Sequence, residues 1–159
     1  MNTSKLWSFC GLLVLALLLQ ACEKSAEQSL TESSLAEQPL IVVEDAFIYE
    51  LPPNQIRAAA YMRLTNNSDK MQALNYIHSP VAENVEVHRM FYQDGMMQMR
   101  PVQRLKLNPG ESKQLESGGF HLMIMGVYEP FKAGDHFDIT LEFETGHVVT
   151  VPVEVRSPG

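Results

Sequence analysis

Residues 85–101 read VEVHRMFYQDGMMQMRP, two runs of strand-forming and thioether side chains separated by Asp94-Gly95. An Asp-Gly pair between two apolar runs is typical of a two-residue type I′ turn, because both turn residues adopt positive φ. The sequence therefore predicts a β-hairpin whose register is fixed by this turn. The residues expected to face each other are His88 and Pro101, Met90 and Met99, Tyr92 and Met97, and Gln93 and Met96.

One face of the predicted hairpin carries histidine and methionine side chains, which can bind a metal ion. Successive side chains of a strand point to opposite faces, so His88, Met90 and Met99 are expected to lie together. A second pair, His121 and Met123, repeats the His-x-Met spacing and shares a face of its own strand. Imidazole nitrogen and thioether sulfur suit copper(I), whereas zinc prefers nitrogen, oxygen and thiolate ligands. The pattern indicates a copper(I) site.

Methionine also has a structural interpretation. The chain has nine methionines, and four of them fall between Met90 and Met99. Methionine commonly fills irregular gaps in a core, and that alternative stays open from composition alone. We interpret Met96, Met97 and Met125 as packing residues or as a soft rim around the copper site.

The rest of the chain from about Leu40 has the sequence pattern of an all-β domain. Short runs rich in Val, Ile, Thr, Phe and Tyr alternate with turn signals such as Asn108-Pro109-Gly110. This spacing favours an antiparallel sandwich or barrel. No helical period and no internal repeat is present. Strands are predicted over residues 41–49, 58–65, 71–78, 85–92, 97–101, 112–116, 121–125, 137–144 and 148–153.

The N-terminus has the features of a bacterial lipoprotein precursor. Residues 1–21 contain Lys5, an apolar run and a small residue before Cys22, which is typical of a signal peptide. Leu19-Gln20-Ala21-Cys22 resembles a lipobox, which implies lipidation of Cys22. An ordinary cleaved signal peptide that happens to end at a cysteine is the alternative. We therefore expect a lipid-anchored protein of the bacterial envelope that faces the periplasm. Glu23 after the cysteine resembles outer-membrane sorting, so the outer membrane is slightly preferred.

The expected organisation has three parts. Residues 1–21 are the signal peptide, and residues 22–39 form a lipid-anchored linker that is rich in Ser, Glu, Gln and Ala and has no aromatic residue. Such a composition is typical of a flexible tether. Residues 40–156 form the copper-binding domain.

Charge and cysteine content exclude several classes of protein. The net charge of −7 argues against nucleic acid as a partner. The two cysteines are Cys10, in the signal peptide, and Cys22, so the domain itself has no thiol. Disulfides, thiol catalysis and a blue-copper electron-transfer site, which needs a cysteine ligand, are thereby excluded. No nucleophile–base pair or acid pair forms a catalytic motif, and we expect the protein not to be an enzyme.

The spacing resembles that of a known family. His88, ten residues, Met99, 21 residues and then His121-Leu122-Met123 match the H-x10-M-x21-H-x-M pattern of the PCu(A)C copper chaperones. The flanks at 85–88, 97–102 and 118–126 are also similar, and the similarity extends over about 42–153. The resemblance implies a cupredoxin-like Greek-key β-sandwich that binds one Cu(I) through His88, Met99, His121 and Met123. Met90 matches a place where the family often has a second methionine, so it is a neighbour or substitute ligand.

The resemblance also implies a partner. It implies delivery of copper to the dinuclear centre of cytochrome c oxidase, together with Sco-type proteins. Some relatives carry a His/Met-rich C-terminal tail, and residues 155–159 (VRSPG) do not have this composition. Two alternatives stay open: a copper buffer or tolerance protein that uses the same site, and a structural β-sandwich lipoprotein without metal. We expect His78, His136 and His147 to be ordinary solvent-facing residues near strand ends, and Tyr92, Arg100 and Phe120 to shield or orient the ligands.

Overall fold

The computed structural model describes residues 39–159, which form ten strands and no helix. This part of the chain accordingly has no helix that could cross a membrane. The all-β prediction is confirmed, while the predicted signal peptide, Cys22 and most of the linker lie outside the described residues. The strands are β1 (Ile41–Tyr49), β2 (Arg57–Asn66), β3 (Gln72–His78), β4 (Ala82–Gln93), β5 (Met96–Pro101), β6 (Leu105–Leu107), β7 (Ser112–Leu115), β8 (Phe120–Val127), β9 (His136–Phe143) and β10 (Val148–Arg156).

The nine predicted strands are confirmed, and their ends differ from prediction by a few residues. The exception is β6, a strand of three residues that the sequence analysis missed. Leu105 and Leu107 of β6 are buried, and the strand pairs with β3. A run of three residues is too short to show a period of two, so only its pairing partner reveals it.

The ten strands form a single sheet in the order β5-β4-β8-β7-β2-β1-β10-β9-β3-β6. Most neighbours are antiparallel, as predicted, but β1 pairs with β10 and β7 pairs with β8 in parallel. The first and last strands are not joined by a short turn, so nothing in the local sequence requires them to run in opposite directions.

The sheet curls over a single core, so that β3 and β4 come close to each other without hydrogen bonding. Alternate residues of the strands point inward, as expected for a sandwich. The fully buried side chains include Met62 and Leu64 of β2, Leu122 of β8, and Ile139 and Leu141 of β9.

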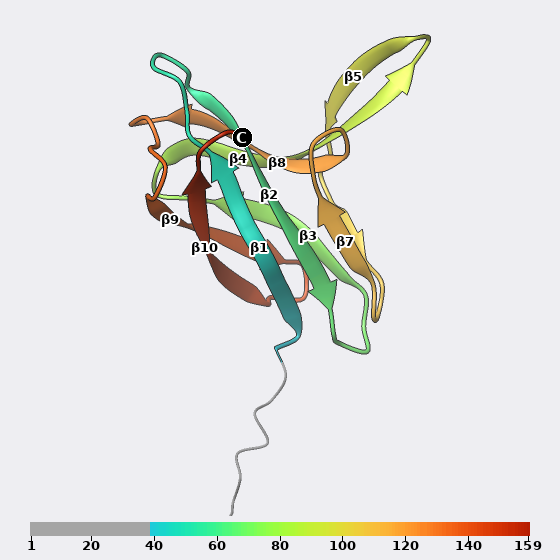
Figure 1. Ribbon diagram of the computed structural model, residues 1–159. Coiled ribbons are helices and arrows are strands. Elements are labelled where there is room, and N and C mark those ends of the chain that lie inside the picture. Colours follow the sequence, from blue (N-terminus) through green and yellow to red (C-terminus); the bar gives the residue numbers. More distant parts are fainter. Residues whose placement is uncertain (1–38) are drawn as a thin grey trace, which may run out of the picture. The chain divides into compact units, whose positions relative to one another are not determined.

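The β4–β5 hairpin projects from the body of the domain (Figure 1). Its turn residues Asp94 and Gly95 have φ of 54° and 77°, the positive values expected for a type I′ turn. β5 is the edge strand of the sheet and pairs only with the distal half of β4. The hairpin is thus a two-stranded extension that carries one edge of the domain into solvent.

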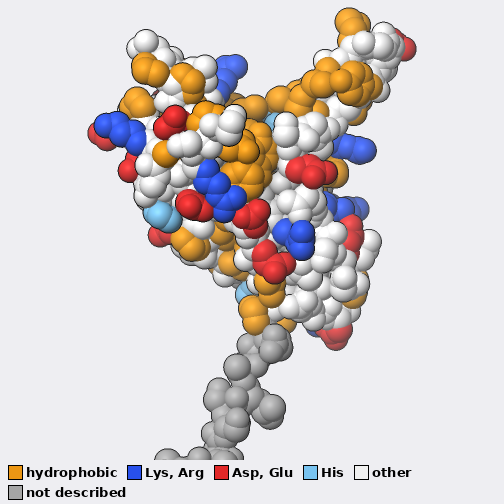
Figure 2. Space-filling model, in the orientation of Figure 1, with side chains coloured by type: hydrophobic (Ala, Val, Ile, Leu, Met, Phe, Trp, Pro, Cys, Tyr) orange, Lys and Arg blue, Asp and Glu red, His pale blue; other side chains and the backbone are white. Residues whose placement is uncertain are grey.

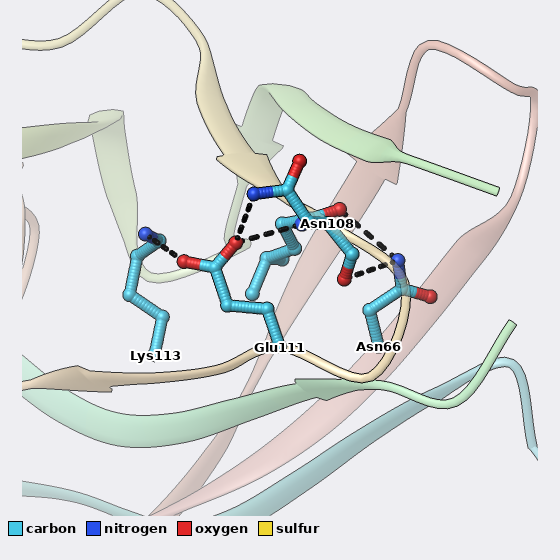
Figure 3. Close-up of polar contacts among 5 residues, drawn as sticks. Asn66, Asn108, Glu111 and Lys113 are labelled. Atoms are coloured by element: carbon cyan, nitrogen blue, oxygen red, sulfur yellow. Dashed lines mark hydrogen bonds and ion pairs between the residues drawn. The ribbon is translucent and has the colours of Figure 1, made fainter. Parts of the chain in front are cut away.

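A buried asparagine connects the loop that follows β2 to the loop that follows β6. Asn66, fully buried at the end of β2, donates from Nδ2 to the carbonyl oxygens of Lys70 (2.8 Å), Leu107 (3.0 Å) and Asn108 (3.1 Å). Its Oδ1 accepts from the backbone N–H and the hydroxyl of Ser68. Figure 3 shows Asn66 against the loop that begins at Asn108. In the same loop the Glu111 carboxylate accepts from Asn108 and pairs with Lys113.

We expect Asn66→Ala to lower the free energy of unfolding by about 2–4 kcal/mol, because it leaves buried carbonyl and N–H groups without partners. Urea denaturation would measure this loss. Thr65→Ala is the matched control: it removes the exposed Thr65–Ser112 hydroxyl contact next door, at an expected cost below about 1 kcal/mol. Equal losses in the two variants would contradict the argument.

Candidate metal site

The predicted register of the hairpin is confirmed. Met90 of β4 faces Met99 of β5, and His88 faces Pro101. Tyr92 faces Met97 and Gln93 faces Met96, also as predicted. Because opposed residues of a pair point to the same face, Met99 shares a face with Met90 and His88.

The neighbouring strand on the other side of β4 brings the second His-x-Met pair to the same face. His121 of β8 lies directly opposite His88, and Met123 lies opposite Glu86. The two imidazole ring centroids are 6.1 Å apart. The structure therefore places His88, Met99, His121 and Met123 on one face of three adjacent strands, with His88 on the central strand.

Burial is graded across this face. His121 is only 2% exposed, His88 and Met123 are half-buried, and Met99 is 44% exposed. Ala59 of β2, a small residue, lies beside Met123 on the far side of β8. The four side chains therefore run from a buried imidazole to a solvent-exposed thioether.

His121 is oriented by the backbone. Its Nδ1 lies 3.3 Å from the carbonyl oxygen of Gly119, the residue that precedes β8. Burial lowers the pKa of His121 and the nearby His88 lowers it further, while the Gly119 hydrogen bond opposes them. A neutral ring is thus favoured, and when Nδ1–H donates to Gly119 the lone pair is on Nε2, available for a metal ion.

His88 has the opposite arrangement. Its Nε2 lies 3.0 Å from Oε2 of Glu86, whereas its Nδ1 is buried without a hydrogen-bond partner. Among residues 39–159 this is the one buried side-chain nitrogen or oxygen atom without a partner. Buried polar atoms are nearly always paired, so an orphaned ring nitrogen beside a second histidine fits a metal ligand.

Glu86 is a residue of this site that the sequence analysis missed. Its carboxylate accepts from His88 and from Asn84, and these hydrogen bonds, the His88 contact first, lower the pKa of Glu86. A carboxylate on the second nitrogen of a ligand histidine fixes its tautomer and orientation. The available signal was the Glu-x-His spacing, which puts both side chains on one face of a strand.

Four of the methionines outside the predicted ligand set lie in different environments. Met62 is a core residue, as the packing interpretation requires. Met125 is half-buried on the site face, opposite Asn84. Met96 and Met97 are 62% and 51% exposed, so the packing alternative is wrong for them, and only Met97 shares the site face.

Two of the three other predicted contributors lie apart from this face. Arg100 and Phe120 both point to the opposite side of the hairpin, where Arg100 lies over Phe91 and Arg89 lies over Phe120. They do not shield the predicted ligands; Tyr92, 73% exposed, does share the site face.

The three remaining histidines are on other parts of the sheet, as expected. His78 ends β3 and approaches Glu142, His136 begins β9, and His147 lies in the turn before β10.

Comparison with solved structures identifies the class of domain. The copper-bound PCuAC domain of PmoF2 superimposes with a TM-score of 0.64 at 22% identity, over 76% of this chain and 95% of that domain. This likeness shows the fold, a cupredoxin-like β architecture, and confirms the fold expected from the sequence.

The family to which the chain belongs is a narrower group than the fold. The chain belongs to the LpqE-like lipoprotein family, a PCu(A)C-like family whose model, described as "Putative lipoprotein LpqE-like", matches residues 41–155. Apo-DR1885 from Deinococcus radiodurans is 31% identical, with a TM-score of 0.58 over 76% of this chain and 82% of that one. The copper(I) form of the same protein is 29% identical, with a TM-score of 0.57 over 75% and 79%.

A lipoprotein from Leifsonia xyli subsp. xyli, named "Putative lipoprotein Lxx21020", is 29% identical over 79 residues. That match covers 49% of this chain and about half the length of the relative, 48%.

Proposed function

We propose that this protein is a copper(I) metallochaperone of the bacterial envelope, which binds one Cu(I) through His88, Met99, His121 and Met123. The observation that carries the proposal is the orphaned, buried Nδ1 of His88 beside His121, on the face that also bears Met99 and Met123. Copper-bound and Cu(I)-bound relatives of the same fold support the choice of metal.

The donor set accounts for the preference for copper(I). Two neutral imidazoles and two neutral thioethers leave the charge of the ion uncompensated, which favours the monovalent state over the divalent one, and thioethers are soft ligands. Thiolates are softer and charged, so an acceptor protein that presents cysteines can take the ion by ligand exchange. Copper is thus a cargo, and the protein carries out no redox step and no catalysis.

The cellular setting follows from the N-terminus and from the relatives named as lipoproteins. Acylation of Cys22 would anchor the protein in the envelope, facing the periplasm, with a preference for the outer membrane. Residues 22–39 would tether the copper domain of residues 40–156 and let it search for an acceptor within a limited radius. The acceptor we propose is the copper centre of cytochrome c oxidase or a Sco-type protein that serves it.

Anaerobic titration with copper(I) against a chromogenic chelator tests this function. We expect one equivalent to bind tightly to the protein, and that binding to be lost in His121→Ala/Met123→Ala. Transfer to a thiolate-bearing acceptor, followed by the same chelator, separates a chaperone from a copper buffer. If copper(I) does not bind tightly, or binds equally well to the double variant, the proposed function is wrong and the methionines have a structural role.

A further inference from the structure

The hairpin carries more thioethers than the four-residue site needs. Met97 lies two residues before Met99 on β5, so the two share a face, and Met90 lies directly opposite Met99. Met90 and Met97 are then diagonal neighbours across the strand pair, a separation that long side chains bridge. Three thioethers therefore converge on the site face of the hairpin.

Core packing does not account for these three residues. Met97 is 51% exposed, Met99 is 44% exposed and Met90 is half-buried, whereas the core methionine Met62 is 0% exposed. Figure 2 shows hydrophobic side chains gathered along the projecting hairpin. A two-stranded extension gains little by exposing long apolar side chains, so their sulfur atoms require another explanation.

The chemistry of the cluster is that of a soft-metal site. Thioethers select copper(I), and none of the three residues bears a charge that would attract a hard cation. Without an imidazole, such a site holds the ion more weakly than the His/Met site does. Met99 belongs to both sets, so the two sites are contiguous.

We propose that Met90, Met97 and Met99 form a second, weaker copper(I) site on the hairpin, through which the ion enters and leaves the His/Met site. This inference rests on the proposed function, because it gives the route to the site assigned there. Copper stays monovalent throughout: bonds from Met90 and Met97 to the ion break as bonds to His88, His121 and Met123 form, and Met99 remains attached. Loss of copper to an acceptor runs the exchange in reverse.

The hairpin supplies a matched control. Met96 is next to Met97 and is somewhat more accessible, at 62% exposed, but its side chain lies on the opposite face, because it faces Gln93 rather than Tyr92. Leucine replaces methionine with little change in volume or hydrophobicity and removes only the sulfur. Met97→Leu and Met96→Leu therefore separate a role for sulfur at one face from a general role for an apolar hairpin.

The experiment is a copper(I) titration of protein labelled with ¹³C in the methionine methyl groups, followed by NMR under anaerobic conditions. We expect the first equivalent to shift the methyl signals of Met99 and Met123. The second, which shares the Met99 sulfur with the first through the second lone pair of that sulfur, is expected to shift the methyl signals of Met90 and Met97 and to leave that of Met96 in place. In Met97→Leu the second equivalent should no longer bind, and the rate of copper transfer to the chelator should fall several-fold. Met96→Leu should behave like the parent protein.

The outcomes distinguish this inference from the function on which it rests. If the first equivalent binds but the second shifts Met96 as much as Met97, or if the two leucine variants behave alike, the hairpin site is wrong and the chaperone function stands. If the first equivalent fails to bind, both proposals fail together.

Discussion

His88→Ala is expected to lower the affinity for copper(I) by more than about 100-fold, since loss of a residue that only supports a ligand already costs 10–100-fold. His88 lies on the central strand of the site face, between Met99 on one side and His121 on the other. Its loss removes one of two imidazoles and leaves the Glu86 carboxylate without its partner. Competition with a copper(I) chelator would measure the change.

His78→Ala is the control for this variant. His78 also has a carboxylate neighbour, with its Nδ1 3.5 Å from Glu142, but it lies at the end of β3, away from the site face. We expect the His78 variant to keep the parent affinity. Thermal unfolding of both variants checks that the domain is still folded. Equal affinity in the parent and the His88 variant would remove His88 from the ligand set.

The hairpin was predictable because its register depends on local chemistry. Asp94-Gly95 fixes a two-residue turn, the turn fixes which residues face each other, and alternation then assigns every side chain to a face. The same alternation places Arg100 on the face opposite to Met99. The expectation that Arg100 shields the site therefore contradicted the rule from which the hairpin was predicted.

Non-local features could not be obtained in this way. The pairing of His88 with His121 joins strands that are far apart in the sequence, and no turn between them sets the register. The parallel pairing of β1 with β10 is of the same kind. A motif indicates that two histidines belong to one site, but only the sheet order shows that they are neighbours on adjacent strands.

The two imidazoles are held by different groups, which gives the site an asymmetry that the sequence does not reveal. Nδ1 of His121 is hydrogen-bonded to the carbonyl oxygen of Gly119, and Nε2 of His88 is hydrogen-bonded to the carboxylate of Glu86. If both contacts persist with copper bound, His121 coordinates through Nε2 and His88 through Nδ1. Glu86 is then a positioning residue.

Glu86→Ala is expected to weaken copper(I) binding by roughly 10- to 100-fold, because the ring of His88 loses the group that fixes its tautomer. Glu86→Gln should lose less, since the amide oxygen still accepts from Nε2–H although the charge is gone. Chelator competition gives the affinities, and ¹⁵N NMR of the histidine rings gives the tautomer of His88 in the metal-free protein. That tautomer should be fixed with the proton on Nε2 in the parent and in Glu86→Gln, and should become mixed in Glu86→Ala.

Glu142→Ala, which removes a carboxylate from His78, provides the matched control, because the total charge changes equally while the site face is untouched. We expect it to leave both the copper affinity and the His88 spectrum unchanged. An equal loss of copper affinity in the Glu86 and Glu142 variants would mean that the net charge of the protein, and not the contact with His88, causes the loss. An unchanged His88 tautomer in Glu86→Ala would mean that the ring is held by the packing of the strand instead of by the carboxylate.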